Sequence, residues 1–282
     1  AAATNGCRLP SSSRKHNSKN FPESTFVTYC VGLRLSQGLV LLSDTRTNAG
    51  IDNVSRFKKM FTWRSRDRAI AMMTSGNLSI TQGVITRLNR AIEESAADDS
   101  IETILSAESM FRVAQLVGER MGEMQDRFRK SLEQRGAAAD ASIIVAGQRK
   151  GGKQRLFLVY SAGNFIEATD DTCYFQIGEH KYGKPILDRV LTPQTPIPEA
   201  LKAVFVSMDS TLRSNLSVGM PLDLAVIKTD TYAFEVERRI ENDDPAFAEI
   251  STRWSDALRE AFHTLPDFYH AKRPSRKAAA KR

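Results

Sequence analysis

The apolar positions at the start of the ordered part of the chain follow the period of a β-strand. In TYCVGLRL, residues 28–35, every second residue from Tyr29 to Leu35 is large and apolar, which is typical of a half-buried strand. The turn SQG and the mostly apolar run LVLLSD follow, so these residues predict a β-hairpin. After a polar loop, TRTNAGIDN, we expect shorter strands around SRFKKMFTW and RAIAMMTS.

The period becomes helical after Gly76. Apolar residues recur at every fourth position from Ile80 to Ile92, which predicts one amphipathic helix. A second helix is predicted from about Ile101 to Leu132, where apolar residues are spaced by three and four. Its methionine-rich stripe is best interpreted as core packing against a neighbouring element.

Strands and helices then alternate in groups up to residue 263. Strands are predicted at ASIIVAGQ, QRLFLVYS, FIEAT and CYFQIG, and two helices near KYGKPILDRVL and PEALKAVFVSMDSTLRS. The strands LDLAVIKTD and YAFEVERRI and a helix over 244–263 complete the series. This order predicts a layered α+β fold with helices outside the sheets. Because no repeat or linker interrupts residues 28–263, we expect a single domain.

The net charge of +7 over 282 residues is concentrated at the two ends. Residues 1–26 carry four basic residues and one acidic residue, and residues 267–282 carry six and one. The body between them is therefore nearly neutral, and specific nucleic-acid binding is not the expected function. Residues 1–27 are polar and without period, so we expect a disordered leader, and residues 264–282 are expected to form a basic disordered tail.

Other features exclude several classes of protein. No apolar run approaches the roughly 20 residues that cross a bilayer, so no membrane partner is expected. Cys7, Cys30 and Cys173 have neither metal-ligand spacing nor a disulfide framework. Such widely spaced thiols fit a cytoplasmic protein, and we expect no metal and no organic cofactor. Only His180 lies in the body away from the ends, so a histidine-based triad has one candidate base.

Thr28 is the first candidate for chemistry. As an internal residue it is simply a β-branched residue suited to a sheet. As the first residue of a processed chain, it would carry its own general base, because an α-amino group has an unperturbed pKa of roughly 7.7–8.0. An internal amide nitrogen cannot accept a proton, so this mechanism requires removal of residues 1–27.

Three further residues fall where such a site needs them. Asp44 ends the second strand of the hairpin, opposite the start of the strand that Thr28 begins. Lys59 lies in FKKM on the expected third strand, where one of Lys58 and Lys59 must point inward, and a buried lysine beside Asp44 would stay charged and lower the pKa of a neighbouring hydroxyl. Gly76 lies at a strand end before a helix, where its N–H can stabilise an oxyanion. Taken singly, a strand-end aspartate, a lysine pair and a Ser-Gly before a helix also have ordinary roles in turns, on surfaces and at helix caps.

Taken together, these residues resemble a known family. The strings TYCVGLRL, SDTRTNAG, FKKM, SAGNF, YFQIGEHKYGKPILDRV and VSMDSTLRSNLSVGMPLDL are similar to the N-terminal nucleophile hydrolases of the proteasome β-subunit type, and most of all to the bacterial Anbu group. The resemblance spans about residues 28–240. It implies that Thr28 is the nucleophile, that Asp44 and Lys59 complete the catalytic group, and that Gly76 supplies the oxyanion amide.

The resemblance also implies a fold and an assembly. The expected fold is a four-layer αββα sandwich of the N-terminal nucleophile hydrolase type. The expected partners are copies of the chain itself in a ring or helical assembly, with a peptide or small amide as substrate. The sequence does not indicate whether a partner ATPase exists. The long helix at 101–132 and the last helix are the expected subunit contacts.

The chain departs from the family pattern at positions that support the amino terminus. Glu179 stands where proteasome β-subunits usually have a serine, and in SNLSVG Ser214 replaces an aspartate while Ser217 matches the serine. Asp209 is a candidate substitute carboxylate. Because such changes alter the groups that orient the α-amine, a weakly active or inactive ring-forming scaffold is the alternative function.

The sequence also leaves alternatives for the start of the mature chain and for the nucleophile. Relatives resemble chains that begin Met-Thr, and Val27 occupies that Met position. We expect either that Val27 is the true start, read from a GTG codon, or that residues 1–27 are a propeptide. The third functional hypothesis, a cysteine enzyme using Cys30 with His180, is the least favoured because Cys30 lies in the middle of a strand.

Overall fold

The computed structural model describes residues 28–48 and 54–268. The expected leader, residues 1–27, and most of the expected basic tail, residues 269–282, lie outside the described residues. Within the described part, the chain forms strands and helices in the groups that the apolar pattern predicts, and the α+β class is confirmed.

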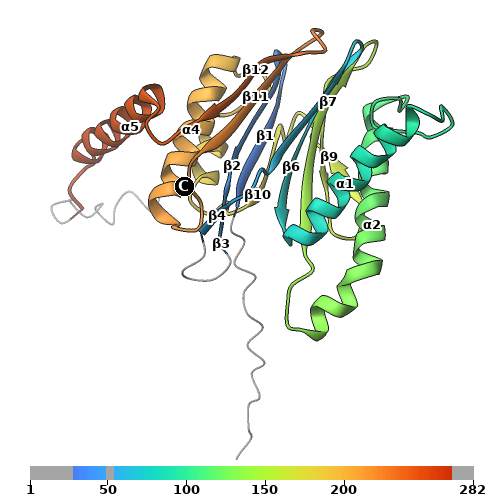
Figure 1. The fold of residues 1–282 in the computed structure, drawn as a ribbon. Coiled ribbons are helices and arrows are strands. Elements are labelled where there is room, and N and C mark those ends of the chain that lie inside the picture. The colour runs from blue at the N-terminus through green and yellow to red at the C-terminus, as the bar shows by residue number, and fades with distance from the viewer. Residues whose placement is uncertain (1–27, 49–53, 269–282) are drawn as a thin grey trace, which may run out of the picture.

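The elements are labelled in Figure 1. The strands are β1 (Tyr29–Leu35), β2 (Gly38–Asp44), β3 (Arg46–Asn48), β4 (Val54–Arg56), β5 (Met60–Ser65), β6 (Arg68–Gly76), β7 (Ala141–Arg149), β8 (Arg155–Val159), β9 (Phe165–Glu167), β10 (Tyr174–Gly178), β11 (Leu222–Lys228) and β12 (Phe234–Ile240). The helices are α1 (Leu78–Ser95), α2 (Met110–Gln134), α3 (Lys184–Val190), α4 (Ile197–Ser214) and α5 (Pro245–His263).

Two antiparallel five-stranded sheets carry the fold. The first has the order β10-β1-β2-β11-β12 and the second the order β5-β6-β7-β8-β9, while β3 and β4 form a separate two-stranded ribbon. The predicted hairpin is confirmed, because β1 pairs with β2 from Cys30 opposite Ser43 to Leu35 opposite Gly38. On its other side β1 pairs with β10, which brings Gly178 opposite Tyr29. The strand that begins after Thr28 is therefore held on both sides.

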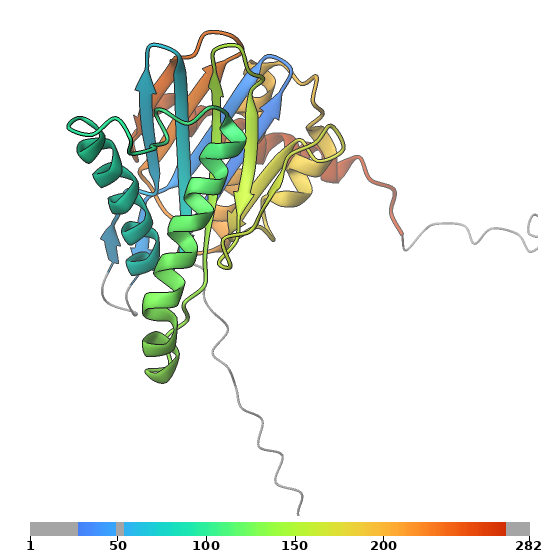
Figure 2. The same ribbon diagram turned by 90° about the vertical axis from the view of Figure 1, so that its right-hand side faces the viewer.

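Apolar side chains pack on both faces of each sheet. Cys30, Met73, Ile144 and Ile227 belong to a cluster between the two sheets. A second cluster packs α1 and α2 against the outer face of the sheet that contains β6 and β7, and Figure 2 shows the two helices covering this face. A third joins α3 and α4 to the outer face of the sheet that contains β1 and β2 (Figure 1). Alternate residues of β1 serve different clusters, since Tyr29 faces the helices and Cys30 the other sheet.

The predicted helix at 101–132 was wrong at its start. The structure begins α2 at Met110, after Ser109 caps it by accepting a hydrogen bond from the Arg112 N–H at 3.1 Å. Residues 101–109 form turns instead, and Ile104 nevertheless packs into the core with α2. The helical spacing of apolar residues therefore extends to residues before the helix, because Ile104 packs into the same core from a turn.

The hairpin is followed by more structure than the sequence indicated. The expected polar loop after Asp44 contains β3, and the strand expected around SRFKKMFTW is divided into β4 and β5. Lys59 lies in the segment between these two strands, not on a third strand as predicted. This segment carries one lysine outward and one inward, because Lys58 is exposed whereas Lys59 is buried.

Candidate active site

Thr28 directly precedes β1 and is buried, with 5% of its surface exposed. Its carbonyl oxygen accepts a hydrogen bond of 2.7 Å from the Glu179 N–H, which follows the end of β10. The next residue, Tyr29, donates its N–H to Asp44 Oδ1 at 2.9 Å. Its phenol hydroxyl lies 2.5 Å from Ser207 Oγ on α4. The chain is thus held from the Thr28 carbonyl onward, by the end of β10, by Asp44 of β2 and, through the Tyr29 side chain, by α4.

Asp44 and Lys59 form a buried ion pair beside this strand end. The distance from Lys59 Nζ to Asp44 Oδ1 is 2.7 Å, and the two side chains are 5% and 0% exposed. Lys59 Nζ also donates to the Arg46 carbonyl at 2.5 Å. Burial raises the pKa of Asp44, while Lys59 and the N–H groups of Tyr29 and Gly219 act in the opposite direction. Lys59 and these two N–H groups therefore favour the charged form of the Asp44 carboxylate against the effect of burial.

Gly76 ends β6 on the facing sheet. The Cys30 thiol donates to the Thr74 carbonyl at 3.7 Å, and the Thr74 N–H donates to the Lys59 carbonyl at 3.0 Å. Thr28 lies two residues before Cys30, and Gly76 lies two residues after Thr74, so both are found at the same edge of the paired sheets. Gly76 has φ +96°, a backbone conformation that favours glycine, and Asn77 immediately after it caps α1.

Gly178 controls how closely β10 approaches Thr28. Its φ is +84°, and a Cβ atom built there would overlap the Thr28 carbonyl oxygen. We expect Gly178→Ala to destabilise the protein by more than about 2 kcal/mol, because the strand edge must shift in addition to the backbone strain. Gly151→Ala is the matched control, since Gly151 has φ +78° with nothing within 4 Å. If urea unfolding shows equal losses of unfolding free energy in Gly178→Ala and Gly151→Ala, the expectation is contradicted.

Glu179 is held in place by a residue that the sequence analysis did not single out. Its Oε2 accepts a hydrogen bond of 2.9 Å from Asn215 Nδ2, and its Oε1 accepts one of 3.0 Å from the Lys181 N–H. Asn215 Oδ1 in turn accepts from the Ser217 N–H at 2.9 Å. The structure therefore links Glu179, beside the Thr28 carbonyl, to the loop after α4.

That loop, residues 215–221, closes over the aspartate. The Gly219 N–H reaches Asp44 Oδ2 at 3.4 Å, and the Pro221 carbonyl accepts from Thr45 Oγ1 at 2.8 Å. Arg46 Nη1 donates to the Leu216 carbonyl at 2.9 Å. The string SNLSVG indicates this loop in the sequence, where Ser214 and Ser217 are the candidates for support of the amino terminus. Asn215 and Gly219, which make the contacts, were missed because their partners are far away in the sequence.

The other candidates for support of the amino terminus have different surroundings. Asp209 is buried and its Oδ2 accepts from Arg213 Nε at 3.0 Å, one turn along the same helix. Ser214 is exposed at the last residue of α4. Ser217 contributes its backbone N–H to Asn215, as described above. The structure thus places Glu179 and Ser217 in one network, and Asp209 in an ion pair of α4.

Cys30 and His180 do not form a catalytic pair in the structure. Burial raises the pKa of the Cys30 thiol well above its usual range, and its hydrogen bond goes to Thr74. His180 is exposed beyond β10, and its Nδ1 lies 3.3 Å from the Gly178 carbonyl. A thiol that stays protonated inside a sheet is a poor nucleophile.

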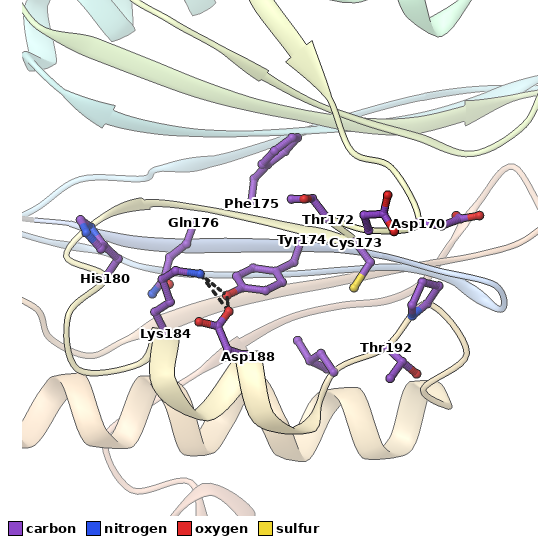
Figure 3. Close-up of a pocket in the computed structure, with 13 residues that line it drawn as sticks. Asp170, Thr172, Cys173, Tyr174, Phe175, Gln176, His180, Lys184, Asp188 and Thr192 are labelled. Carbon is purple, nitrogen blue, oxygen red and sulfur yellow. Dashed lines mark hydrogen bonds and ion pairs between the residues drawn. The ribbon is translucent and has the colours of Figure 1, made fainter. Parts of the chain in front are cut away.

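A cavity of about 660 Å³ runs beside β10. Figure 3 shows the Tyr174 ring against Lys184 and Asp188 from α3, with His180 at one end and Asp170 at the other. Lys184 Nζ lies 2.8 Å from Asp188 Oδ1 and 2.9 Å from the Tyr174 hydroxyl. None of Thr28, Asp44, Lys59 and Gly76 lines this cavity, so it is separate from the candidate catalytic group.

Residues 28–48 and 54–268 contain no cluster of three or more histidine, cysteine, aspartate or glutamate side chains suited to a metal ion. Within the same ranges, none of the helices combines the length and the apolar character that spanning a bilayer requires.

Comparisons with known proteins gave results for solved structures alone. No protein-family model matches the chain, and no curated protein matches it. Among solved structures, the chain is similar to an Anbu (Gly-1) mutant from Hyphomicrobium sp. strain MC1, with 46% identity, a TM-score of 0.79, and coverage of 86% of this chain and 99% of that one.

Two further solved structures give the same picture. Anbu (ancestral beta-subunit) from Yersinia bercovieri is 41% identical with a TM-score of 0.80, over 87% of this chain and 100% of that one. The helical assembly of the Anbu complex from Pseudomonas aeruginosa is 42% identical with a TM-score of 0.79, over 88% and 99%.

Proposed function

The chain belongs to the Anbu family, whose members are related to proteasome β-subunits, and from this premise we propose that it is a threonine hydrolase that cleaves amide bonds through Thr28. One observation carries the proposal. The buried Lys59–Asp44 pair lies beside the point where β1 begins, and Asp44 also accepts from the N–H that follows Thr28. An ion pair this deep is costly to build, which favours a functional reason for it.

In the proposed reaction, the chain begins at Thr28 and its α-amino group is the general base. Thr28 Oγ1 attacks the amide carbonyl carbon and passes its proton to the α-amine. The Gly76 N–H stabilises the resulting oxyanion. Collapse breaks the C–N bond, and the leaving amine takes the proton from the α-ammonium. Water then hydrolyses the acyl ester and restores the threonine.

The proposal extends to the fold and the assembly. The two sheets with helices on their outer faces support a four-layer αββα sandwich of the N-terminal nucleophile hydrolase type, and residues 28–263 support a single domain. The Pseudomonas relative is described as a helical assembly, so we propose that this chain also works in a self-assembled, ring-like or helical oligomer. A peptide or small amide is the proposed substrate, and the cytoplasm the proposed location.

One observation favours the scaffold alternative. Of the residues expected to support the amino terminus, Ser214 is exposed and Asp209 is paired with Arg213. A site whose α-amine is poorly oriented would bind substrate without turning it over. The two candidates are separated by a threonine-directed covalent probe together with N-terminal sequencing of the native protein. Labelling of a chain that begins at Thr28 supports the hydrolase, and retention of any upstream residue removes the mechanism.

The pH dependence of labelling tests the role proposed for Glu179. Labelling requires a neutral α-amine, so its rate should rise with pH through the pKa of that amine. We propose that the Glu179 carboxylate acts on the α-amine, because the Glu179 backbone N–H contacts the Thr28 carbonyl. A carboxylate near an amine favours the ammonium form, so Glu179→Gln is expected to move the midpoint to lower pH by roughly 0.5–1 unit. Glutamine can still accept from Asn215 through its single amide oxygen, which keeps the link to the loop, while the hydrogen bond from the Lys181 N–H is lost. A fall in rate at every pH with an unchanged midpoint would show a purely structural role.

A further inference from the structure

The last helix, α5, extends beyond the helix that supports it. The rings of Phe205 and Phe247 are 5.8 Å apart, and Arg213 Nη2 donates to Ser251 Oγ at 2.8 Å. The contact partners advance together along both helices, so α4 and α5 cross with their N-to-C directions broadly parallel. Because α4 ends at Ser214, the second half of α5 has no part of α4 beneath it. Figure 1 shows this half extending away from the sheets.

The overhang, defined here as residues 252–265, nevertheless carries an apolar stripe. Trp254, Leu258 and Phe262 are spaced by four residues each, which places them on one face of α5, and Leu265 follows just after the helix ends at His263. The exposed fractions of the last three are 49%, 69% and 65%. This face continues the one that packs on α4 through Phe247. Trp254 is half-buried, and beyond it the stripe has the pattern of a packed helix face but stays exposed among residues 28–48 and 54–268.

Such a face needs a covering surface, because no residue of α5 is buried in the single chain. Helical segments of this length are marginal in water without tertiary packing, and an apolar stripe at the end of a projecting helix is typical of an association surface. A groove of about 220 Å³ lies between α4, β12 and the first turns of α5, lined by side chains such as Phe205 and Ile250, and is separate from the overhang.

The chemistry of the overhang favours a second copy over the chain's own ends. Residues 269–282 hold six basic residues, no acidic residue and, apart from Tyr269, no large apolar side chain, so they are poorly matched to an apolar stripe. In residues 1–27, Leu9, Phe21 and Phe26 have no helical spacing. The overhang itself is formally neutral over residues 252–263, with two arginines and two acidic residues, so two copies do not repel each other.

We propose that the α5 overhang packs against the same overhang of a second copy of this chain, in a two-fold contact that uses each stripe residue twice. This contact names a surface for the self-assembly proposed above. It is independent of whether Thr28 is a nucleophile.

Charge insertion tests the contact directly. Leu258→Glu and Phe262→Glu, each made in the full chain, bury two carboxylates in the two-fold contact and should weaken self-association by at least about 100-fold in sedimentation velocity. Thr252→Glu is the matched control, since it adds the same charge on an exposed polar position of the same helix. The control should keep the wild-type size distribution. A wild type that is monomeric, or glutamate variants that assemble like wild type, would overturn the proposal.

The tryptophan content of the chain allows a second readout. Trp63 and Trp254 are its two tryptophans, so Trp63→Phe leaves Trp254 as a reporter at the start of the stripe. Its emission should shift to the blue as protein concentration rises through the association range, and Leu258→Glu should remove the shift. A shift independent of concentration would place the chain's own tail or leader on the stripe and refute the two-fold contact.

Failure of the proposed α5 contact can be distinguished from failure of the proposed hydrolase activity. Labelling of Thr28 by the covalent probe is measured on the same variants. Loss of assembly with or without labelling supports the contact, whereas absent labelling in an assembled wild type contradicts only the hydrolase.

Discussion

The Thr28→Ala variant is expected to lose covalent labelling and amide hydrolysis by at least about 10³-fold, to the level of background, because the variant has no hydroxyl to form the acyl ester. The fold should be kept. Thr28 contributes its carbonyl to the Glu179 N–H, and alanine retains that carbonyl. Intact-mass spectrometry of the probe adduct and a panel of fluorogenic peptides measure the effect.

Two variants control this experiment. Thr28→Ser keeps a hydroxyl and an α-amine and should still be labelled. Cys30→Ser should be labelled like wild type, because the Cys30 thiol lies between the sheets with its pKa raised by burial. Unchanged labelling of Thr28→Ala would exclude the proposed nucleophile, and loss of labelling in Cys30→Ser would point to the thiol instead.

The Lys59→Met variant is expected to lose about 3–5 kcal/mol of unfolding free energy and its activity as well. Methionine can fill much of the space of the lysine side chain, but it leaves the fully buried Asp44 carboxylate without its 2.7 Å ion pair. Equilibrium unfolding in urea measures the loss. Desolvation explains why the variant is destabilised and not stabilised. Burial raises the pKa of Asp44 even in the presence of Lys59, so the charged carboxylate becomes still less favourable when Lys59 is removed.

A matched pair on the surface controls for the loss of a lysine. Lys184 and Asp188 are 2.8 Å apart, as close as the buried pair to within 0.1 Å, but both are 49% exposed. Lys184→Met should therefore cost no more than about 1 kcal/mol. The double variant Asp44→Asn with Lys59→Met should be more stable than Lys59→Met alone, because it removes the uncompensated charge. Equal costs for the two lysine substitutions would show that burial does not set the energetics of this pair.

The β-hairpin of residues 28–44 was predictable because its information is local. Alternation of apolar residues sets which face is buried, and the short turn sets the register, so the start of β1 had to meet the end of β2. Asp44 was placed beside Thr28's strand for this reason. The resemblance to the proteasome β-subunit type then supplied the roles of Lys59 and Gly76.

The surroundings of Asp44 and Glu179 were not predictable from local pattern. The Gly219 N–H reaches Asp44 over 175 residues of sequence, and Asn215 reaches Glu179 over 36. Periodicity also placed the start of α2 nine residues too early, since Ile104 fills the same core from a turn. Spacing along the chain records which side chains are buried, but does not record which backbone conformation buries them.

The sequence by itself determined the strand and helix groups, the α+β class, the family resemblance and the identity of the four candidate catalytic residues. The tertiary structure alone decided that Lys59 is the buried lysine of its pair, that loop 215–221 closes over Asp44, and that α5 extends past α4. The physical reason is the range of the interactions. Apolar periodicity and turns act between near neighbours, whereas hydrogen bonds to a buried carboxylate and the cover of a helix face depend on elements brought together only by the complete fold.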